Sequence, residues 1–392
     1  MFSDSTLGVL LKALPRDEIA KLVDRHGSDK WRKSFTTWDH LVAMLTAQFS
    51  GVTSLRELEA VLADQDHHHY HLGFQGVKRS TLSDSNKSRT PAVFRDLLQV
   101  MIRRSGRQSD ELNKLLTVLD ASNIRLAGKG YEWAEKTRTR TTCFGLKLHV
   151  RMDHSSEMLE DASITPTNVN DLTAGKDFEL ERGRVYVFDK GYCDYNWWLK
   201  IMENGSHFVT RLKVNAAYKV SQSRQISDKS QGHILQDQVV ELTNRYPKAK
   251  KTSHLVGKPL RLVQIKHPGG KSRPFLIVCS DLTASAEQIA SWYKQRWSIE
   301  LLFKWVKQNL KIKRFMGQSR NAVMIQIYVA LIAYILLKLY KKMQANSTAL
   351  RLKDVVITLR TRLFERAEMF QKRQKHRHKT FQNQHELWGF PS

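Results

Sequence analysis

Cysteine and acidic residues are both scarce in this chain of 392 residues. The three cysteines are far apart and form no Cys-x-x-Cys pair, which argues against a zinc ribbon or a disulfide framework. No glycine-rich phosphate loop of the Walker type occurs, so ATP hydrolysis is not indicated. The sequence has 38 Asp and Glu against 64 Lys and Arg, a formal charge of +26. This excess predicts a polyanionic partner, either nucleic acid or an anionic membrane surface.

The chain also lacks an apolar run long enough to cross a bilayer. The longest run, residues 325–337, falls short of the roughly 20 residues that a spanning helix needs, so we expect a buried helix there. Residues 1–15 have an apolar stretch, but no small-residue cleavage site follows it, which is not typical of a secretory signal. We therefore expect a cytoplasmic protein that has no membrane partner.

Hydrophobic periodicity predicts an α/β protein made of five segments. Apolar residues at three-to-four spacing, such as Leu41, Met44 and Leu45, indicate helices, whereas the alternation over residues 144–152 indicates a strand. Residues 213–273 contain 13 Lys and Arg but three acids, with short strand-like runs. The expected segments are a helical N-terminal domain (1–110), the first part of an α/β core (111–213), a basic β-rich insertion (214–280), a helical second part of the core (281–345) and a basic C-terminal tail (346–392).

A polar segment follows the helix that we expect to begin near Ser54. It mixes cations with short hydrogen-bond donors, and its cations include Arg79, Lys87 and Arg89. Such residues suit contacts with nucleic-acid phosphates. We therefore expect a loop in which these three residues contact DNA.

Two aspartates follow short apolar runs that are typical of central strands. Asp120 comes after residues 115–119 and Asp189 after residues 185–188. If the two strands are neighbours, their ends bring the carboxylates together. Together with a third carboxylate from a helix, they could hold two magnesium ions that activate a nucleophile and stabilise the leaving oxygen of a phosphodiester. The alternative for either aspartate alone is a solvated turn.

The third carboxylate is expected from one long helix that Ser285 caps and that reaches about residue 310. Tyr293, Arg296, Glu300 and Lys307 stand at offsets 0, 3, 7 and 14, which places them within a stripe of roughly 60° on a regular helix. The alternative is an exposed ion pair between Arg296 and Glu300, which would stabilise the helix only slightly. A tyrosine and a second cation on the same stripe favour a site.

These residues resemble a known signature. Asp120, Asp189 with Gly191-Tyr192 after it, and Tyr293-x2-Arg296-x3-Glu300-x6-Lys307 are similar to the motifs of DDE transposases of the bacterial insertion-sequence family called IS-four. The resemblance covers residues 30–345. It implies an RNase H-like catalytic core that a β-rich insertion interrupts, with an N-terminal helical DNA-binding domain and C-terminal helices.

The resemblance also implies a mechanism, a cofactor and partners. Asp120, Asp189 and Glu300 would bind divalent metal, magnesium or else manganese, while Tyr293, Arg296 and Lys307 would contact DNA. The enzyme would cut the ends of an insertion sequence and join the freed 3′ ends to target DNA. Its partners would be double-stranded DNA, as terminal inverted repeats and target, and a second protomer, in a bacterial cytoplasm at the nucleoid. The alternatives are an inactive or domesticated DNA-binding relative and an RNase H-like nuclease without strand transfer.

Overall fold

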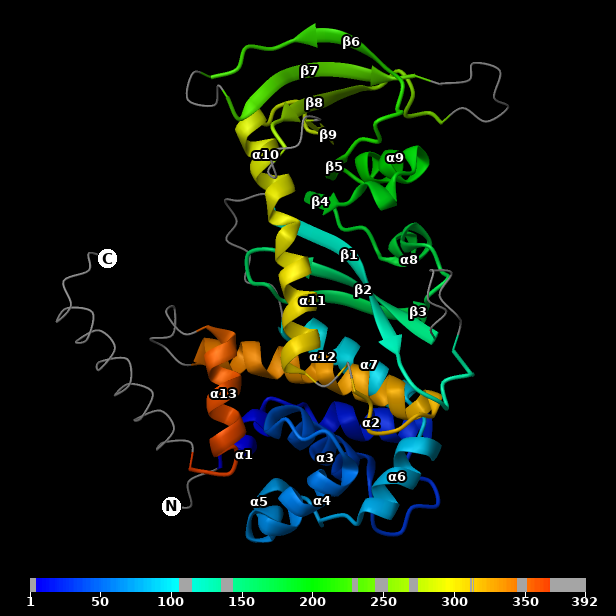
Figure 1. Cartoon of the computed structure of the whole chain (residues 1–392), viewed down its shortest axis with the longest axis vertical. Helices are drawn as coiled ribbons and strands as arrows, with labels where there is room; N and C mark the ends of the chain where they lie inside the picture. The colour runs from blue at the N-terminus through cyan, green and yellow to red at the C-terminus, as the bar shows by residue number, and fades with distance from the viewer. Residues whose placement is uncertain are drawn as a thin grey trace, which may run out of the picture. The chain divides into compact units, whose positions relative to one another are not determined.

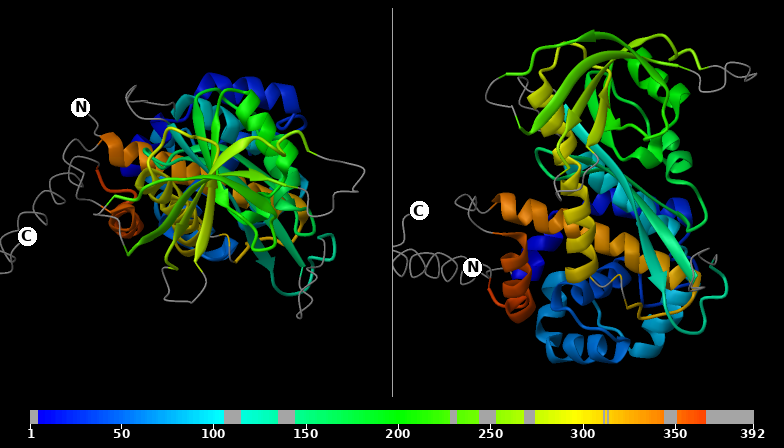
Figure 2. Two further views of the ribbon diagram at one scale, coloured as in Figure 1. Left: turned by 90° about the horizontal axis from the view of Figure 1, so that it is seen from above. Right: turned by 45° about the horizontal axis from the view of Figure 1, so that its top comes forward.

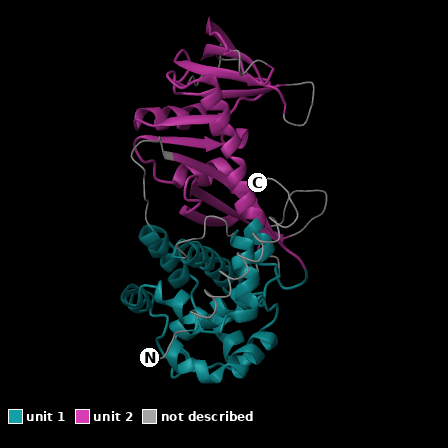
Figure 3. Ribbon diagram, turned by 90° about the vertical axis from the view of Figure 1, so that its left-hand side faces the viewer, with its two compact units in different colours: residues 1–105, 128–133, 305–392 teal, residues 106–127, 134–304 magenta. Residues whose placement is uncertain are grey.

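The computed structural model describes residues 5–105, 115–134, 144–227, 232–243, 253–267, 274–310, 312, 314–343 and 351–366. The chain forms two compact units, which Figure 3 distinguishes by colour. Unit 1 comprises residues 1–105, 128–133 and 305–392, and unit 2 comprises residues 106–127 and 134–304. The basic run at residues 372–379, within the expected C-terminal tail, lies outside the described residues.

Unit 1 is helical in its described part and draws on both ends of the chain (Figure 1). The long helix α12 packs against α3, α6, α7 and α13 and forms the centre of the unit. The helices of this unit are α1 (Thr6–Lys12), α2 (Arg16–His26), α3 (Thr37–Ser50), α4 (Leu55–Asp64), η1 (Asp66–His68), α5 (His69–Leu72), α6 (Arg79–Ser88), α7 (Ala92–Ser105), α12 (Arg320–Met343) and α13 (Leu352–Arg362).

The apolar run at residues 325–337 is buried within α12, as expected. The helix is longer than the run that predicted it, since polar residues extend it at both ends. Among the described residues, α12 alone is long and apolar enough by length and composition to cross a membrane. It is instead covered by the other helices of unit 1, which makes it the core helix of this unit.

Two segments of unit 1 differ from the expectation. The polar segment that holds Arg79 and Lys87 is the helix α6 and not a loop, because Leu82 and Asn86 on one of its faces are buried. Asn86 Oδ1 accepts a hydrogen bond from Nε2 of the buried His40 of α3 at 2.8 Å. Part of the expected C-terminal tail is α13, which packs against α3 and α12. Tertiary contacts therefore order both segments.

Unit 2 is a nine-stranded mixed sheet with helices on both faces. Its strand order is β3-β2-β1-β4-β5-β9-β8-β7-β6, and the strands fan out with a strong twist when seen from above (Figure 2). The strands are β1 (Leu115–Leu126), β2 (Phe144–Asp153), β3 (Leu159–Pro166), β4 (Arg184–Phe188), β5 (His207–Arg211), β6 (Tyr218–Ser223), β7 (Ile234–Leu242), β8 (Pro259–Ile265) and β9 (Phe275–Cys279).

The residues expected as an insertion extend the same sheet. Strand β9 pairs antiparallel with β5, and β8, β7 and β6 follow in turn, so all four strands continue the core. Strand β1 is parallel to β4 and antiparallel to β2, and β4 is parallel to β5. The carboxyl ends of β1, β4 and β5 therefore point in one direction.

Two apolar clusters sandwich this sheet. On one face Phe188 and Phe208 pack against Trp198 of α9 (Tyr195–Glu203), and α8 (Asp171–Asp177) lies on the same side (Figure 1). On the other face Val185 and Val187 pack against α10 (Ala286–Gln295). Alternate residues of each strand face opposite sides, so β4 contributes to both clusters. The remaining described elements are η2 (Lys190–Tyr192) and α11 (Trp297–Asn309).

Candidate active site

The parallel pairing of β1 and β4 sets Asp120 and Asp189 at the same level. Val118 is the register partner of Val187, and each aspartate comes two residues later in its strand direction. Asp189 directly follows β4, as expected. Asp120 does not end its strand, because β1 stays paired with β2 as far as Leu126. The expected strand end at Asp120 is therefore wrong, although β4 ends there and leaves that side of β1 open.

Both aspartates belong to the sheet face that α10 covers. Leu116, Val185 and Val187 all pack in the α10 cluster, and Asp120 and Asp189 follow them at even spacing. Ser285 caps α10 by accepting a hydrogen bond from the Gln288 amide at 3.1 Å, as predicted. This cap fixes where the helical segment that carries Arg296 and Glu300 begins.

Arg296 interrupts the expected single helix. It lies between α10 and α11, and the Ile299 amide donates to its carbonyl at 3.3 Å, which is the tighter i to i+3 pattern. The backbone of Arg296 nevertheless stays in the helical region, at φ −52° and ψ −31°. Arg296 contacts both Tyr293 and Glu300, so these three residues lie on one stripe, as expected. The Arg296 side chain is 12% exposed.

Arg296 bridges two of the three predicted carboxylates. One guanidinium nitrogen is 3.4 Å from Asp120 Oδ2, and the other is 2.6 Å from Glu300 Oε1. In the described part of the chain, no other cation forms an ion pair with Asp120, Asp189 or Glu300. Two of the three acids thus share Arg296, and Asp189 forms no ion pair among the described residues.

The pKa of Asp120 is raised to about 6. Burial is the main cause, because a desolvated carboxylate is disfavoured. The negative charges of Glu300 and Asp189 raise this pKa further, while the Ala121 amide and Arg296 lower it. The Ala121 amide donates to Asp120 Oδ1 at 2.8 Å. A bound cation would favour the ionised form of Asp120.

Two tyrosines and a second arginine complete the surroundings. Tyr293 is buried in the α10 cluster and lies 5.9 Å below the Arg296 guanidinium, measured to the ring centroid. Burial raises the pKa of both Tyr293 and Tyr192, and the charge of Asp189 adds to this effect in each case. Arg211, the last residue of β5, is close enough to Tyr293 to oppose the rise. Sequence reasoning missed Arg211, although the strand-end argument that selected Asp189 applies to it equally.

The residues fit a divalent metal in donor type and in charge. Asp120, Asp189 and Glu300 offer only carboxylate oxygens, which hard cations prefer. As they stand, no three such groups among the described residues are close enough to hold one ion. The gap between Asp120 and Glu300 already accepts a positive group, the Arg296 guanidinium. Metal binding there requires this guanidinium to move aside.

The other predicted DNA-contacting residues belong to unit 1. Arg79 and Lys87 are exposed on α6, and Lys307 lies in the last turn of α11. Arg89 is buried, and its guanidinium hydrogen-bonds to the carbonyls of three other residues of unit 1. A DNA contact by Arg89 is therefore contradicted, because its donors are directed into the protein.

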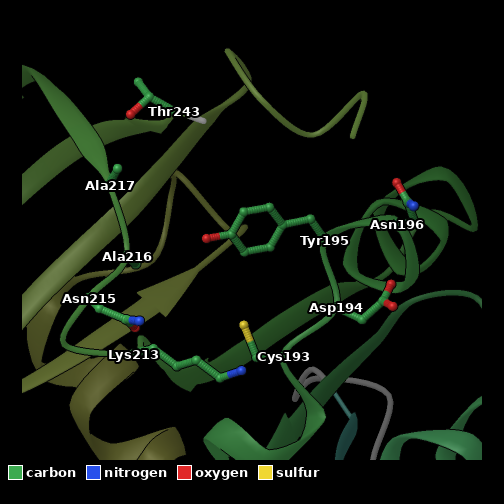
Figure 4. Close-up of a pocket in the computed structure, with 9 residues that line it drawn as sticks. All are labelled: Cys193, Asp194, Tyr195, Asn196, Lys213, Asn215, Ala216, Ala217 and Thr243. Carbon is green, nitrogen blue, oxygen red and sulfur yellow. The ribbon is translucent and has the colours of Figure 1, made fainter. Parts of the chain in front are cut away.

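A hollow of about 370 Å³ opens among residues that follow β4 and β5 (Figure 4). Its lining combines an aromatic ring, a cation, an amide and a thiol, from Tyr195, Lys213, Asn215 and Cys193. Burial raises the pKa of the Cys193 thiol, and Lys213 opposes the rise. The hollow is a polar recess in the loops of the sheet edge that carries Asp189.

Comparison with known proteins shows the family to which the chain belongs. A family model described as a transposase DDE domain matches residues 111–336, and a domain of unknown function matches residues 3–75. A protein of Sinorhizobium fredii named as a transposase is 36% identical over 293 residues, or 74% of this chain and 78% of the relative. A protein of Geobacillus stearothermophilus, named as an insertion-sequence transposase, is 28% identical over 66% of each chain.

A solved structure shows a related fold. The piggyBac transposase in a synaptic complex with hairpin DNA superposes with a TM-score of 0.50 at 12% identity, covering 95% of this chain and 82% of that chain. The present chain therefore belongs to the DDE transposase family. It is a bacterial insertion-sequence transposase, an enzyme that cuts and joins DNA and depends on divalent metal.

Proposed function

We propose that this transposase acts by two-metal chemistry at Asp120, Asp189 and Glu300. It recognises the terminal inverted repeats of an insertion sequence of the IS-four kind, cuts the phosphodiester at each end and joins the 3′ ends to target DNA. The metal is magnesium, with manganese as a substitute. The observation that carries the proposal is the convergence of three carboxylates: Asp120 and Asp189 follow paired residues of neighbouring parallel strands, and Arg296 links Asp120 to Glu300.

In this proposal the acids, Arg296 and Tyr293 have different roles in catalysis. When bound, the divalent metals activate the attacking oxygen and stabilise the leaving oxygen of the phosphodiester. Asp120, Asp189 and Glu300 hold them, and the Ala121 amide orients the Asp120 carboxylate. Arg296, displaced from Asp120 and Glu300, donates its planar fork to a DNA phosphate. Tyr293 supports Arg296 from below through ring contact.

The catalytic fold that we propose is RNase H-like. Its support is the central β1, antiparallel to β2 and parallel to β4, together with the piggyBac superposition. Unit 1 and the strands β6–β9 would provide DNA-binding surfaces, with Arg79, Lys87 and Lys307 among the phosphate contacts. Two protomers would pair the element ends in the cytoplasm, at the nucleoid. The basic run at 372–379 would add further contacts with DNA.

A cleavage and joining assay tests the proposal. The substrate is an end-labelled duplex that carries the inverted repeat found beside the reading frame, incubated with supercoiled target plasmid. Magnesium or manganese should yield a nick at the repeat boundary and a joined product, whereas calcium or EDTA should yield neither. End binding without cuts in either metal would support the inactive DNA-binding relative. Cuts without joined product would support the nuclease without strand transfer.

A further inference from the structure

A loop in unit 1 exposes a tryptophan among cations. The Trp31 loop, residues 28–36, connects α2 to α3, and its tip reads Lys30-Trp31-Arg32-Lys33. Trp31 is 90% exposed, and the three cations beside it are exposed as well. A large apolar ring held in water gains nothing from folding. The position of Trp31 therefore favours a partner outside the described chain.

The base of this loop is rigid, and Arg89 holds it. The Arg89 guanidinium donates to the carbonyls of Ser28 at 3.4 Å, Phe35 at 2.8 Å and Thr36 at 3.2 Å. It also donates to the Asp29 carboxylate at 3.3 Å. Arg89 thus binds both ends of the loop and fixes its position.

The tip is equally ordered, and its backbone is strained. Turn hydrogen bonds run from the Lys30 amide to the Gly27 carbonyl at 3.1 Å and from the Arg32 amide to the Asp29 carbonyl at 3.0 Å. They hold Trp31 at φ +66°, a left-handed conformation that is unfavourable for a residue with a bulky side chain. Such strain persists where the surrounding structure enforces it, commonly at binding sites. At Trp31 the left-handed backbone and the exposed indole occur together.

Exposed cations surround the indole on the loop and on the neighbouring helix. Lys30 Nζ lies 5.7 Å from the centroid of the Trp31 ring. Arg32 donates to Ser88 Oγ at 2.8 Å and so ties the tip to the end of α6, where Lys87 is exposed. A stacking ring among phosphate-binding cations is the combination that proteins use on unstacked nucleic-acid bases. An anionic membrane would accept the same charges, but the DNA chemistry of this family favours a duplex.

We propose that the Trp31 loop is a DNA-contacting wedge. Trp31 stacks on a base at an opened step of the element end, and Lys30 and Lys33 bind the flanking phosphates. Arg89 is a positioning residue that fixes the loop before DNA arrives. This inference rests on the proposed function and adds to it a specific surface on unit 1.

The test measures the affinity of the full chain for a labelled duplex that carries the element end, at several salt concentrations. Trp31→Asn should weaken binding roughly tenfold at unchanged salt dependence, the loss expected for one stacked base. Asparagine adopts a positive φ more readily than tryptophan does, so the unfolding temperature should be unchanged or slightly higher. Lys30→Gln with Lys33→Gln should instead lower the slope of log affinity against log salt by roughly two.

The matched control is Tyr70→Asn, since Tyr70 is 89% exposed in the same unit but has histidines and no lysine or arginine beside it. That variant should bind like the parent. If the parent binds and cuts the element end while Trp31→Asn binds as tightly, the wedge is wrong and the proposed function stands. Weaker binding of Trp31→Asn to anionic lipid vesicles, with DNA binding unchanged, would also overturn it. A parent that neither binds nor cuts refutes the proposed function instead.

Discussion

Two clusters of acids and arginines in the described part of unit 2 differ in their balance of charge. In the first, Glu160 and Glu181 pair with Arg151 and Arg184 at 2.9 to 3.4 Å, two acids to two cations. The second is the candidate active site, where Arg296 pairs with Asp120 and Glu300, and Asp189 forms no ion pair among the described residues. Arg184 is 1% exposed and Glu160 6%, so the first cluster is buried and internally neutralised.

The contrast shows what distinguishes a structural cluster from a reactive one. Strand β1 takes part in both, since Thr117 donates to Glu160 at 3.1 Å and Asp120 lies three residues later, on the opposite face. Matched charges close the first cluster to outside ions. In the second, burial raises the pKa of Asp120 to about 6, and the negative charges of Glu300 and Asp189 add to the rise. Charge balance therefore indicates function more reliably than acid content does.

The largest expected effect is a loss of DNA cleavage when an acid of the candidate active site is replaced. Asp120→Asn, Asp189→Asn and Glu300→Gln should each lower cleavage of the element end by several orders of magnitude, because each removes a metal ligand. DNA binding in calcium should stay near that of the parent. The measurement is a magnesium-dependent cleavage time course beside a gel-shift titration. Near-normal cutting by any one of the three variants would remove that residue from the site.

Replacing an acid of the first, neutralised cluster should instead lower the stability of the protein. Glu160→Gln leaves Arg151 and Arg184 short of a buried counterion and should destabilise the protein by about 3 to 5 kcal/mol. Denaturant unfolding followed by tryptophan fluorescence measures this loss. Cleavage per folded molecule should be unchanged at low temperature. A variant that is as stable as the parent but fails to cut would reverse the assignment of the two clusters.

Much of the fold can be predicted from local sequence signals. The alternation after Phe144 predicts β2, Ser54 and Ser285 cap the helices expected to begin there, and the apolar run in α12 predicts a buried helix. Asp189 could be selected as a candidate because a short apolar run predicts where β4 ends. Each of these signals depends on neighbouring residues alone.

The remaining features depend on partners far along the chain. Helix α6 has few strong helix formers, and its burial against α3 through Asn86 and His40 is not visible in its own sequence. The contact between Arg296 and Asp120 joins residues 176 positions apart, so neither local sequence reveals it. Arg89 shares a polar segment with two exposed cations, and only the fold shows that it faces inward.

A smaller effect is expected in how the stability of the folded protein depends on pH. The pKa of Asp120 in the folded chain is about 6, above its ordinary value of about 3.9. The folded state therefore holds an extra proton between about pH 4 and 6, and ionised Asp120 destabilises it fully above that window. Asp120→Asn should stabilise the metal-free protein by up to about 2 to 3 kcal/mol at pH 8 and hardly at all at pH 4.

Denaturant titrations in EDTA at the two pH values measure this difference. Asp177→Asn, an exposed aspartate at the end of α8 in the same unit, is the matched control and should show no such dependence. An equal effect of Asp120→Asn at both pH values would mean that the carboxyl is already neutralised in the folded protein. The charge-balance argument would then fail for the active site.

The smallest expected effect concerns the geometry of the single arginine. Arg296→Lys keeps the charge but loses the planar fork that reaches Asp120 and Glu300 at once. An ammonium can neutralise one carboxylate at a time, and it cannot grip two oxygens of a phosphate in a fixed plane. Cleavage should fall roughly tenfold at saturating DNA, an amount typical of a lost orienting contact. The metal requirement should be unchanged, because no ligand is removed. Lys294→Arg, an exposed change two residues earlier, is the control and should cut like the parent. If Arg296→Lys also cuts like the parent, the charge of residue 296 suffices, and the bridge between Asp120 and Glu300 has no catalytic consequence.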